Sequence, residues 1–182
     1  MPPFLKLDIS DIPALLGAYA LGPTAGVIVV AIKNIVHLST SSSAYVGELA
    51  NFLAGAFFVG TAGLIYKRMS NKKGIVLGFA SGTLAMTLFT SFFNYFFLLD
   101  FYSNLWGVPM EKIVAMTAAV NGLVSDVKTL VVFAFVPFNL FKGILLSFIT
   151  GLLYWRLEPL LKKSRNRWRR GLSSTRMDDI HE

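Results

Sequence analysis

The sequence contains no cysteine and only two histidines, His37 and His181, which stand far apart. The lack of cysteine excludes disulfides, thiolate nucleophiles and Cys-ligated metals, and no pair of carboxylates occurs at a metal-ligand spacing. Charged residues make up only 15% of the chain, whereas a typical soluble domain has about 25%. The N-terminus also lacks the basic stretch and apolar core of a signal peptide. These absences argue against a disulfide-bonded protein and against a metalloenzyme.

Apolar residues dominate instead: 54% of the 182 residues are hydrophobic and 14% are aromatic. This composition is typical of an integral membrane protein. The net charge of +7 comes largely from two basic clusters, at residues 67–73 and 162–176, that stand beside apolar runs. Basic residues in that position flank membrane helices on the cytoplasmic side. We therefore expect contact with the lipid bilayer and no binding of nucleic acid.

The last apolar run, residues 136–157 (VPFNLFKGILLSFITGLLYWRL), is long enough to cross a bilayer, which takes about 20 helical residues. Asn139 and Lys142 are three positions apart, so a helix places both on one face, near its start. A lysine inside a membrane costs up to about 3 kcal/mol and is usually kept for a function. The alternative is that Lys142 reaches back to the interface and Asn139 caps the helix.

Two further runs, residues 45–66 and 75–99, are also long enough to span. Glu48 and Asn51 repeat the three-residue spacing in the first of them, and Asn94 lies near the end of the second. Small residues that permit close helix packing recur in the first run: Gly47, Ala50, Ala54, Gly55, Gly60, Ala62 and Gly63. Residues 100–135 are predicted to form a structured loop with a short helix at 110–120, and residues beyond 159 to fray.

Residues 11–38 allow two arrangements, because Gly22-Pro23 interrupts the apolar pattern. They form either one kinked span or a short helical hairpin, in both cases with Ser10 or Asp11 as the N-cap. With both basic clusters in the cytoplasm, only the hairpin brings one set of polar residues to the outer face: Lys6, Asp8, Glu48, Asn51, Asn94, Asn139 and Lys142. That convergence favours the hairpin.

Polar residues at one depth on several helices, below a covering loop, predict a small-molecule pocket. Asparagine amides suit a uracil-like edge, while Lys and Asp suit carbonyls and hydroxyls. Aromatic residues near the same end either stack on a flat ligand or form an interface belt; these are Phe92, Phe93, Tyr95 and Phe96. No nucleophile with a base, metal cluster or phosphate-binding glycine loop is present, so we do not expect an enzyme.

Several motifs occur in an order that resembles the riboflavin-specific substrate-binding (S) component of bacterial energy-coupling-factor (ECF) transporters. They are LKLDISDIP, IKN, GELANFLAG, NYF and VPFNLFKG, and they cover most of residues 5–157. The resemblance implies an all-α bundle of six membrane helices in the plasma membrane, with no cofactor and no ATPase activity. It also implies riboflavin as the ligand and, as partners, a transmembrane coupling subunit and two ATP-binding subunits.

By the same resemblance, Asn94, Asn139 and Lys142 match riboflavin-contacting positions, and residues 5–8 match the external loop that touches the ligand. Together with the polar residues of the outer face, the predicted substrate-binding set is Leu5, Lys6, Asp8, Glu48, Asn51, Asn94, Asn139 and Lys142. Residues 1–158 are expected to form one transmembrane domain and 159–182 a basic cytoplasmic tail.

The chain departs from the family pattern at its start, where the first helix and its AxxxA coupling motif are absent. We therefore expect a polypeptide truncated at its N-terminus relative to its functional relatives. Two alternatives remain open from the residues alone. One is an S component for another vitamin; the other is a membrane scaffold whose polar residues only join helices.

Overall fold

The computed structural model describes residues 8–39, 46–107 and 109–178, and this part of the chain is helical, without strands. It begins with α1 (Asp11–Leu21), α2 (Pro23–Leu38), α3 (Val46–Met69) and α4 (Lys72–Phe93). The π-helical segment η1 (Asn94–Leu98) continues α4 into α5 (Leu99–Trp106), and α6 (Met110–Ala118) follows. Then α7 (Val127–Leu130) and the π-helical η2 (Val131–Phe135) lead into α8 (Val136–Asp178). The all-α prediction is confirmed.

Three of these helical stretches are long and apolar enough to cross a membrane: Gly47–Met69, Lys72–Phe101 and Val127–Leu157. They contain nearly all of the three predicted runs. The last begins earlier than predicted, because a capping box starts a helix at Asp126. The Asp126 carboxylate accepts from the Thr129 backbone N–H at 2.7 Å, and the Asp126 N–H donates to Thr129 Oγ1 at 2.8 Å. Residues 127–135 are therefore helical, and the loop predicted there is wrong.

The hairpin arrangement of residues 11–38 is confirmed. α1 ends at Leu21, Gly22 turns the chain with a φ of +109°, and Pro23 begins α2. Gly22 suits this turn because that φ disfavours residues with a side chain. The two helices then pack closely, since a Cβ at Gly26 would lie 2.6 Å from Ala18 Cβ.

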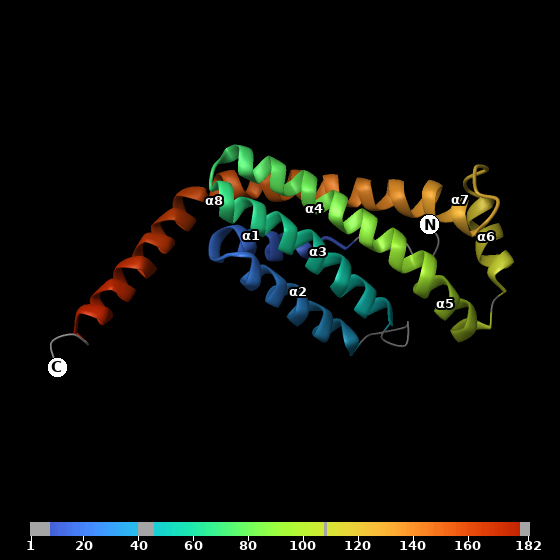
Figure 1. The fold of residues 1–182 in the computed structure, drawn as a ribbon, viewed down its shortest axis with the longest axis horizontal. Coiled ribbons are helices and arrows are strands. Elements are labelled where there is room, and N and C mark those ends of the chain that lie inside the picture. The colour runs from blue at the N-terminus through green and yellow to red at the C-terminus, as the bar shows by residue number, and fades with distance from the viewer. Residues whose placement is uncertain (1–7, 40–45, 108, 179–182) are drawn as a thin grey trace.

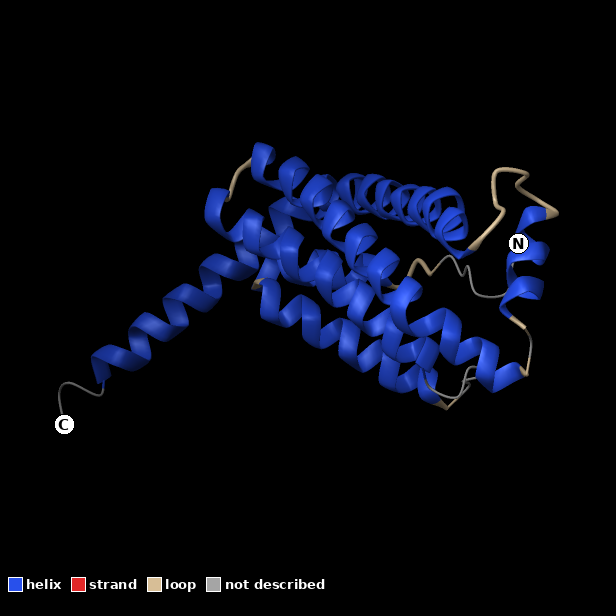
Figure 2. Ribbon diagram, turned by 45° about the vertical axis from the view of Figure 1, so that its right-hand side comes forward, coloured by secondary structure: helices blue, strands red, loops and turns tan. Residues whose placement is uncertain are grey.

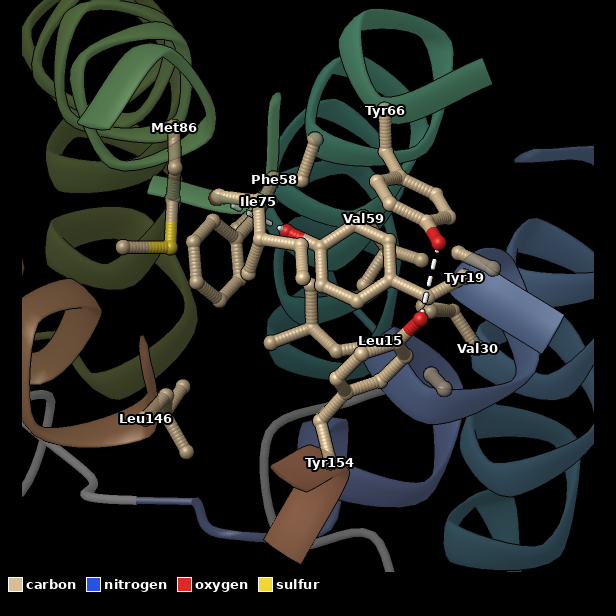
Figure 3. Close-up of a cluster of buried hydrophobic side chains, with 14 residues drawn as sticks. Leu15, Tyr19, Val30, Phe58, Val59, Tyr66, Ile75, Met86, Leu146 and Tyr154 are labelled. Atoms are coloured by element: carbon tan, nitrogen blue, oxygen red, sulfur yellow. Dashed lines mark hydrogen bonds between the residues drawn. The ribbon is translucent and has the colours of Figure 1, made fainter. Parts of the chain in front are cut away.

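The helices form an elongated bundle with two distinct ends (Figure 1). At one, the turn end, lie the α1–α2 and α3–α4 turns; at the other, the cap end, lie α5, α6 and α7. α1 contacts α2, α3 and α8, so it is enclosed by the bundle. Its buried residues Leu15 and Tyr19 join the core shown in Figure 3, where the Tyr66 and Tyr154 hydroxyls are 2.8 Å apart.

A second apolar cluster closes the cap end. It comprises Leu99, Ile113, Val114, Val124, Leu130, Val131 and Phe135. The predicted short helix at 110–120 is confirmed as α6, and this region packs on the helix ends as expected. The start of the loop predicted at residues 100–135 is helical, because α5 continues the α4–η1 helix through Asp100 and Asn104, and the chain turns at Gly107, whose φ is +59°.

The C-terminal part of α8 leaves the bundle at the turn end and points away from it in both views (Figures 1 and 2). α8 extends to Asp178, so the prediction that residues beyond 159 fray is wrong. Lysine, arginine and leucine, which dominate residues 160–172, are strong helix formers. Helix propensity therefore continues the last span beyond its apolar part.

Candidate functional site

A network of buried polar side chains lies in the half of the bundle nearer the cap end, around the start of α1. Its first member, Asp8, precedes α1 and is held by two other helices. Asp8 Oδ2 accepts from Lys33 Nζ on α2 at 2.8 Å and from Asn51 Nδ2 on α3 at 3.0 Å. Its other oxygen accepts from the Ser10 N–H at 2.8 Å. These bonds fix the segment that enters α1.

The same bonds keep Asp8 ionised. Burial raises the pKa of this carboxyl, but the hydrogen bonds from Lys33, Ser10 and Asn51 outweigh that effect and hold the pKa well below its ordinary range. Because the pKa is lower in the folded state, the stabilisation is present above the ordinary pKa of aspartate. It is lost as the pH falls through the folded-state value.

We expect Asp8→Asn to lower the free energy of unfolding at pH 7 by about 1 kcal/mol, because a neutral acceptor binds the Lys33 ammonium more weakly. Thermal unfolding in detergent between pH 3 and 7 measures this. The difference in Tm between variant and parent should shrink below about pH 4, where aspartate ordinarily protonates. Asp100→Asn, at an exposed position, is the control and should leave Tm unchanged. Equal Tm values for Asp8→Asn and parent at pH 7 would contradict the expectation.

The centre of the network is Asp11, whose side chain is 0% exposed. Its Oδ1 lies 2.5 Å from Lys33 Nζ, and its Oδ2 lies 3.8 Å from Lys142 Nζ on α8. Of the two residues predicted as the N-cap of α1, the structure has Ser10 in that position, without a side-chain cap bond, and Asp11 is the first helical residue. Two carboxylates thus face two ammonium groups, which balances the buried charge.

Amide side chains extend the network between α2 and α3. Asn51 Nδ2 donates to Asn34 Oδ1 at 3.1 Å, and Asn34 Nδ2 donates to the Val30 carbonyl at 2.8 Å. Asn139 on α8 is also buried, and its Nδ2 donates to the Phe135 carbonyl, at the end of η2, at 2.8 Å. Asn94, the first residue of η1, is also buried. Within the described part of the chain, neither Asn94 nor Asn139 hydrogen-bonds to the network.

The structure thus brings together three residues of the predicted set, Asp8, Asn51 and Lys142. Glu48 lies beside the network, in a groove of about 320 Å³ between α2 and α3 that is lined by Ala31, Asn34, Ile35, Leu38, Glu48, Leu49 and Phe52. Leu5 and Lys6 fall outside the described residues. Lys142 is only 5% exposed, so its side chain lies inside the bundle and not at the lipid-facing surface.

Two of the aromatic residues considered for stacking lie on the outside of the bundle. Phe92 is 57% exposed and Phe96 is 53% exposed, and their ring centroids are 4.6 Å apart. Tyr95 packs against the apolar cluster of the cap end. Phe92 and Phe96 therefore fit an interface belt better than a wall of an enclosed pocket.

The sequence analysis missed three network members: Asp11, Lys33 and Asn34. Lys33 carried a usable signal, since it interrupts the apolar run of residues 24–38 just as Lys142 interrupts the last run. Asn34 follows it directly. Asp11 carried no such signal, because an acidic residue at a helix start is common for capping alone.

This arrangement suits binding rather than covalent chemistry. No group of three or more metal-binding side chains occurs among the described residues. The Lys142 ammonium carries three donors, and its distance of 3.8 Å from Asp11 is longer than a hydrogen bond. A few directed polar groups inside an apolar bundle are what a small, polar-edged ligand requires.

Two known transporters are similar to this chain in sequence. The chain is 38% identical over 163 residues to the riboflavin transporter RibU of Staphylococcus aureus (strain TCH60), covering 90% of this chain and 80% of that protein. It is 32% identical over 169 residues to the riboflavin transporter FmnP of Bacillus subtilis (strain 168), covering 91% of this chain and 83% of that protein.

A solved structure described as the S component of a bacterial ECF transporter superimposes with a TM-score of 0.69 at 38% identity. The match covers 89% of this chain and 83% of that one. The model of the family described as "ECF transporter, substrate-specific component" matches residues 1–154. The family model, the relatives and the solved structure agree, and the chain belongs to the substrate-specific components of ECF transporters.

Proposed function

We propose that this chain binds riboflavin with high affinity and captures it for an ATP-driven ECF vitamin importer. The observation that carries the proposal is its similarity to two riboflavin transporters over at least 80% of their length. Membership of a family of transporter components also agrees with a sequence in which no catalytic groups were identified.

The geometry supports a ligand site at the cap end. Asn94, Asn139 and Lys142 are all buried there, on η1 and on the first turns of α8. An amide presents a donor and an acceptor side by side, as the pyrimidine-like edge of a flavin requires, and the ammonium can donate to a carbonyl. In this proposal the three residues bind the flavin ring.

The proposed partners follow from the family. The chain would work with a transmembrane coupling subunit and two ATP-binding subunits, as a multi-pass protein of the bacterial plasma membrane. The cap end would face outward, where the vitamin arrives, and the basic tail of residues 159–182 would lie in the cytoplasm.

Titration of the detergent-purified protein with riboflavin tests the proposal, since burial of the ring changes flavin fluorescence. We expect saturable quenching with one site per chain and no competition from thiamine or biotin in excess. Competition by another vitamin would favour an S component of different specificity. Flat fluorescence with a folded chain, shown by cooperative thermal unfolding, would remove the proposal.

Cysteine labelling tests the orientation, because the native chain has no cysteine. Asn71 lies in the α3–α4 turn among basic residues, which resist translocation. A cysteine at Asn71 should stay unlabelled by an impermeant maleimide applied to intact cells and react after lysis. A cysteine at exposed Lys128, near the cap end, should react in intact cells. The reverse pattern would invert the proposed topology.

A further inference from the structure

The carboxylate of Asp11 stands between ammonium groups from two helices. Its oxygens lie 2.5 Å from Lys33 Nζ on α2 and 3.8 Å from Lys142 Nζ on α8. All three side chains are buried, with exposures of 0%, 11% and 6%. Asp11 therefore connects the α1–α2 hairpin to the first turns of α8, where the proposed ligand site lies.

We infer that Asp11 is a positioning residue for Lys142, with its buried carboxylate holding the ammonium in place to donate to the ligand. The inference rests on the proposed function, because it assumes that Lys142 contacts riboflavin. Asp11 itself does not touch the ligand in this scheme; it acts through Lys142.

Asp11 is the nearest counter-charge of Lys142. Among the described residues, no other carboxylate lies within 4.0 Å of Lys142 Nζ. Asp8, the other carboxylate of the network, accepts hydrogen bonds from Lys33, Asn51 and Ser10. Without Asp11, the Lys142 ammonium would lose its partner within 4.0 Å, and its side chain would move toward a more distant one such as Asp8.

The distance of 3.8 Å explains how the same ammonium can also serve a ligand. At this separation Asp11 attracts the charge without forming a short hydrogen bond. The donors of Nζ remain available for an acceptor on the ligand. Gly55 on α3 leaves room for both Val30 and the carboxylate, since a Cβ at that position would lie 2.7 Å from Val30 Cγ1 and 3.1 Å from Asp11 Oδ1. α3 thus helps to set the carboxylate position.

The test asks how much Lys142→Met weakens riboflavin binding in three backgrounds. In the parent and in Lys33→Met, Asp11 is still present, so Lys142→Met should raise Kd at least about fivefold. In Asp11→Asn/Lys33→Met, which removes one charge of each sign, Lys142 is no longer held. There, adding Lys142→Met should change Kd less than about twofold.

Thermal unfolding shows which variants are folded, and a purely structural role for Asp11 would lower Tm without changing the effect of Lys142→Met. Should the doubly substituted background fail to fold, Asp11→Asn alone replaces it, because the amide keeps the shape of the side chain and removes its charge. The inference is overturned if Lys142→Met costs the same in every background, or if Lys33→Met alone abolishes that cost. An unaffected Kd in Lys142→Met also overturns the inference, because Lys142 then does not contact the ligand, whereas failure of the parent to bind riboflavin counts against the proposed function.

Discussion

Gly63→Ala should destabilise the bundle by about 3 kcal/mol, although alanine is the better helix former by about 1 kcal/mol. A Cβ at Gly63 would lie 2.9 Å from Pro23 Cα and 3.1 Å from both Ala18 Cβ and Pro23 Cβ. Two of the three atoms belong to Pro23, and the nearest is in its backbone, so they cannot rotate away. The added methyl group must push the α1–α2 turn off α3.

Gly60→Ala is the matched control, because it makes the same change one turn earlier on α3. Its Cβ would meet only Val27 Cγ2, at 3.5 Å, which is an ordinary van der Waals contact. Thermal unfolding in detergent should show a clear fall in Tm for Gly63→Ala and an unchanged or higher Tm for Gly60→Ala. Equal Tm values for the two variants would mean that α3 does not support the hairpin at this point.

This pair also shows how far sequence patterns predict packing. The recurrence of small residues in the run 45–66 correctly indicated close packing by α3. It did not distinguish Gly63, which contacts the hairpin turn, from Gly60, which has room for a side chain. That difference depends on where another pair of helices crosses α3, and such crossing points are long-range information that a local pattern does not contain.

The membrane helices were predictable because length and hydropathy are local properties. The hairpin at Gly22 was predictable for a different reason. The basic loops predict a direction for each span, and with those directions only a hairpin places the polar residues at one end. The start of the last span was not predictable in this way. The capping box of Asp126 and Thr129 begins the helix there, before the predicted start at residue 136.

The candidate site was predicted in part. Lys142 was found because a lysine in an apolar run is costly, and Asp8 and Asn51 because they fall at the same depth. Asp11 was missed, since its role depends on two lysines that are 22 and 131 residues away along the chain. Pairings between distant residues become visible only when the helices are placed in space.

Lys142→Met should weaken riboflavin binding by about five- to a hundredfold, which corresponds to about 1–3 kcal/mol. The substitution keeps the length and apolar reach of the side chain while it removes the ammonium. A bound flavin would then lose a charged donor, and its acceptor would stay buried without a partner. Flavin fluorescence titration measures the change in Kd.

The variant should nevertheless fold, which separates a binding role from a structural one. Asp11 keeps Lys33 as its partner at 2.5 Å, so no carboxylate is left alone, and a buried methionine costs less in a membrane than a buried ammonium. We therefore expect a Tm at least equal to that of the ligand-free parent. Lys128→Met, the same change at an exposed lysine of α7, should leave Kd within about twofold. An unchanged Kd in Lys142→Met would show that this lysine only pairs with Asp11, and that the flavin is held by other residues.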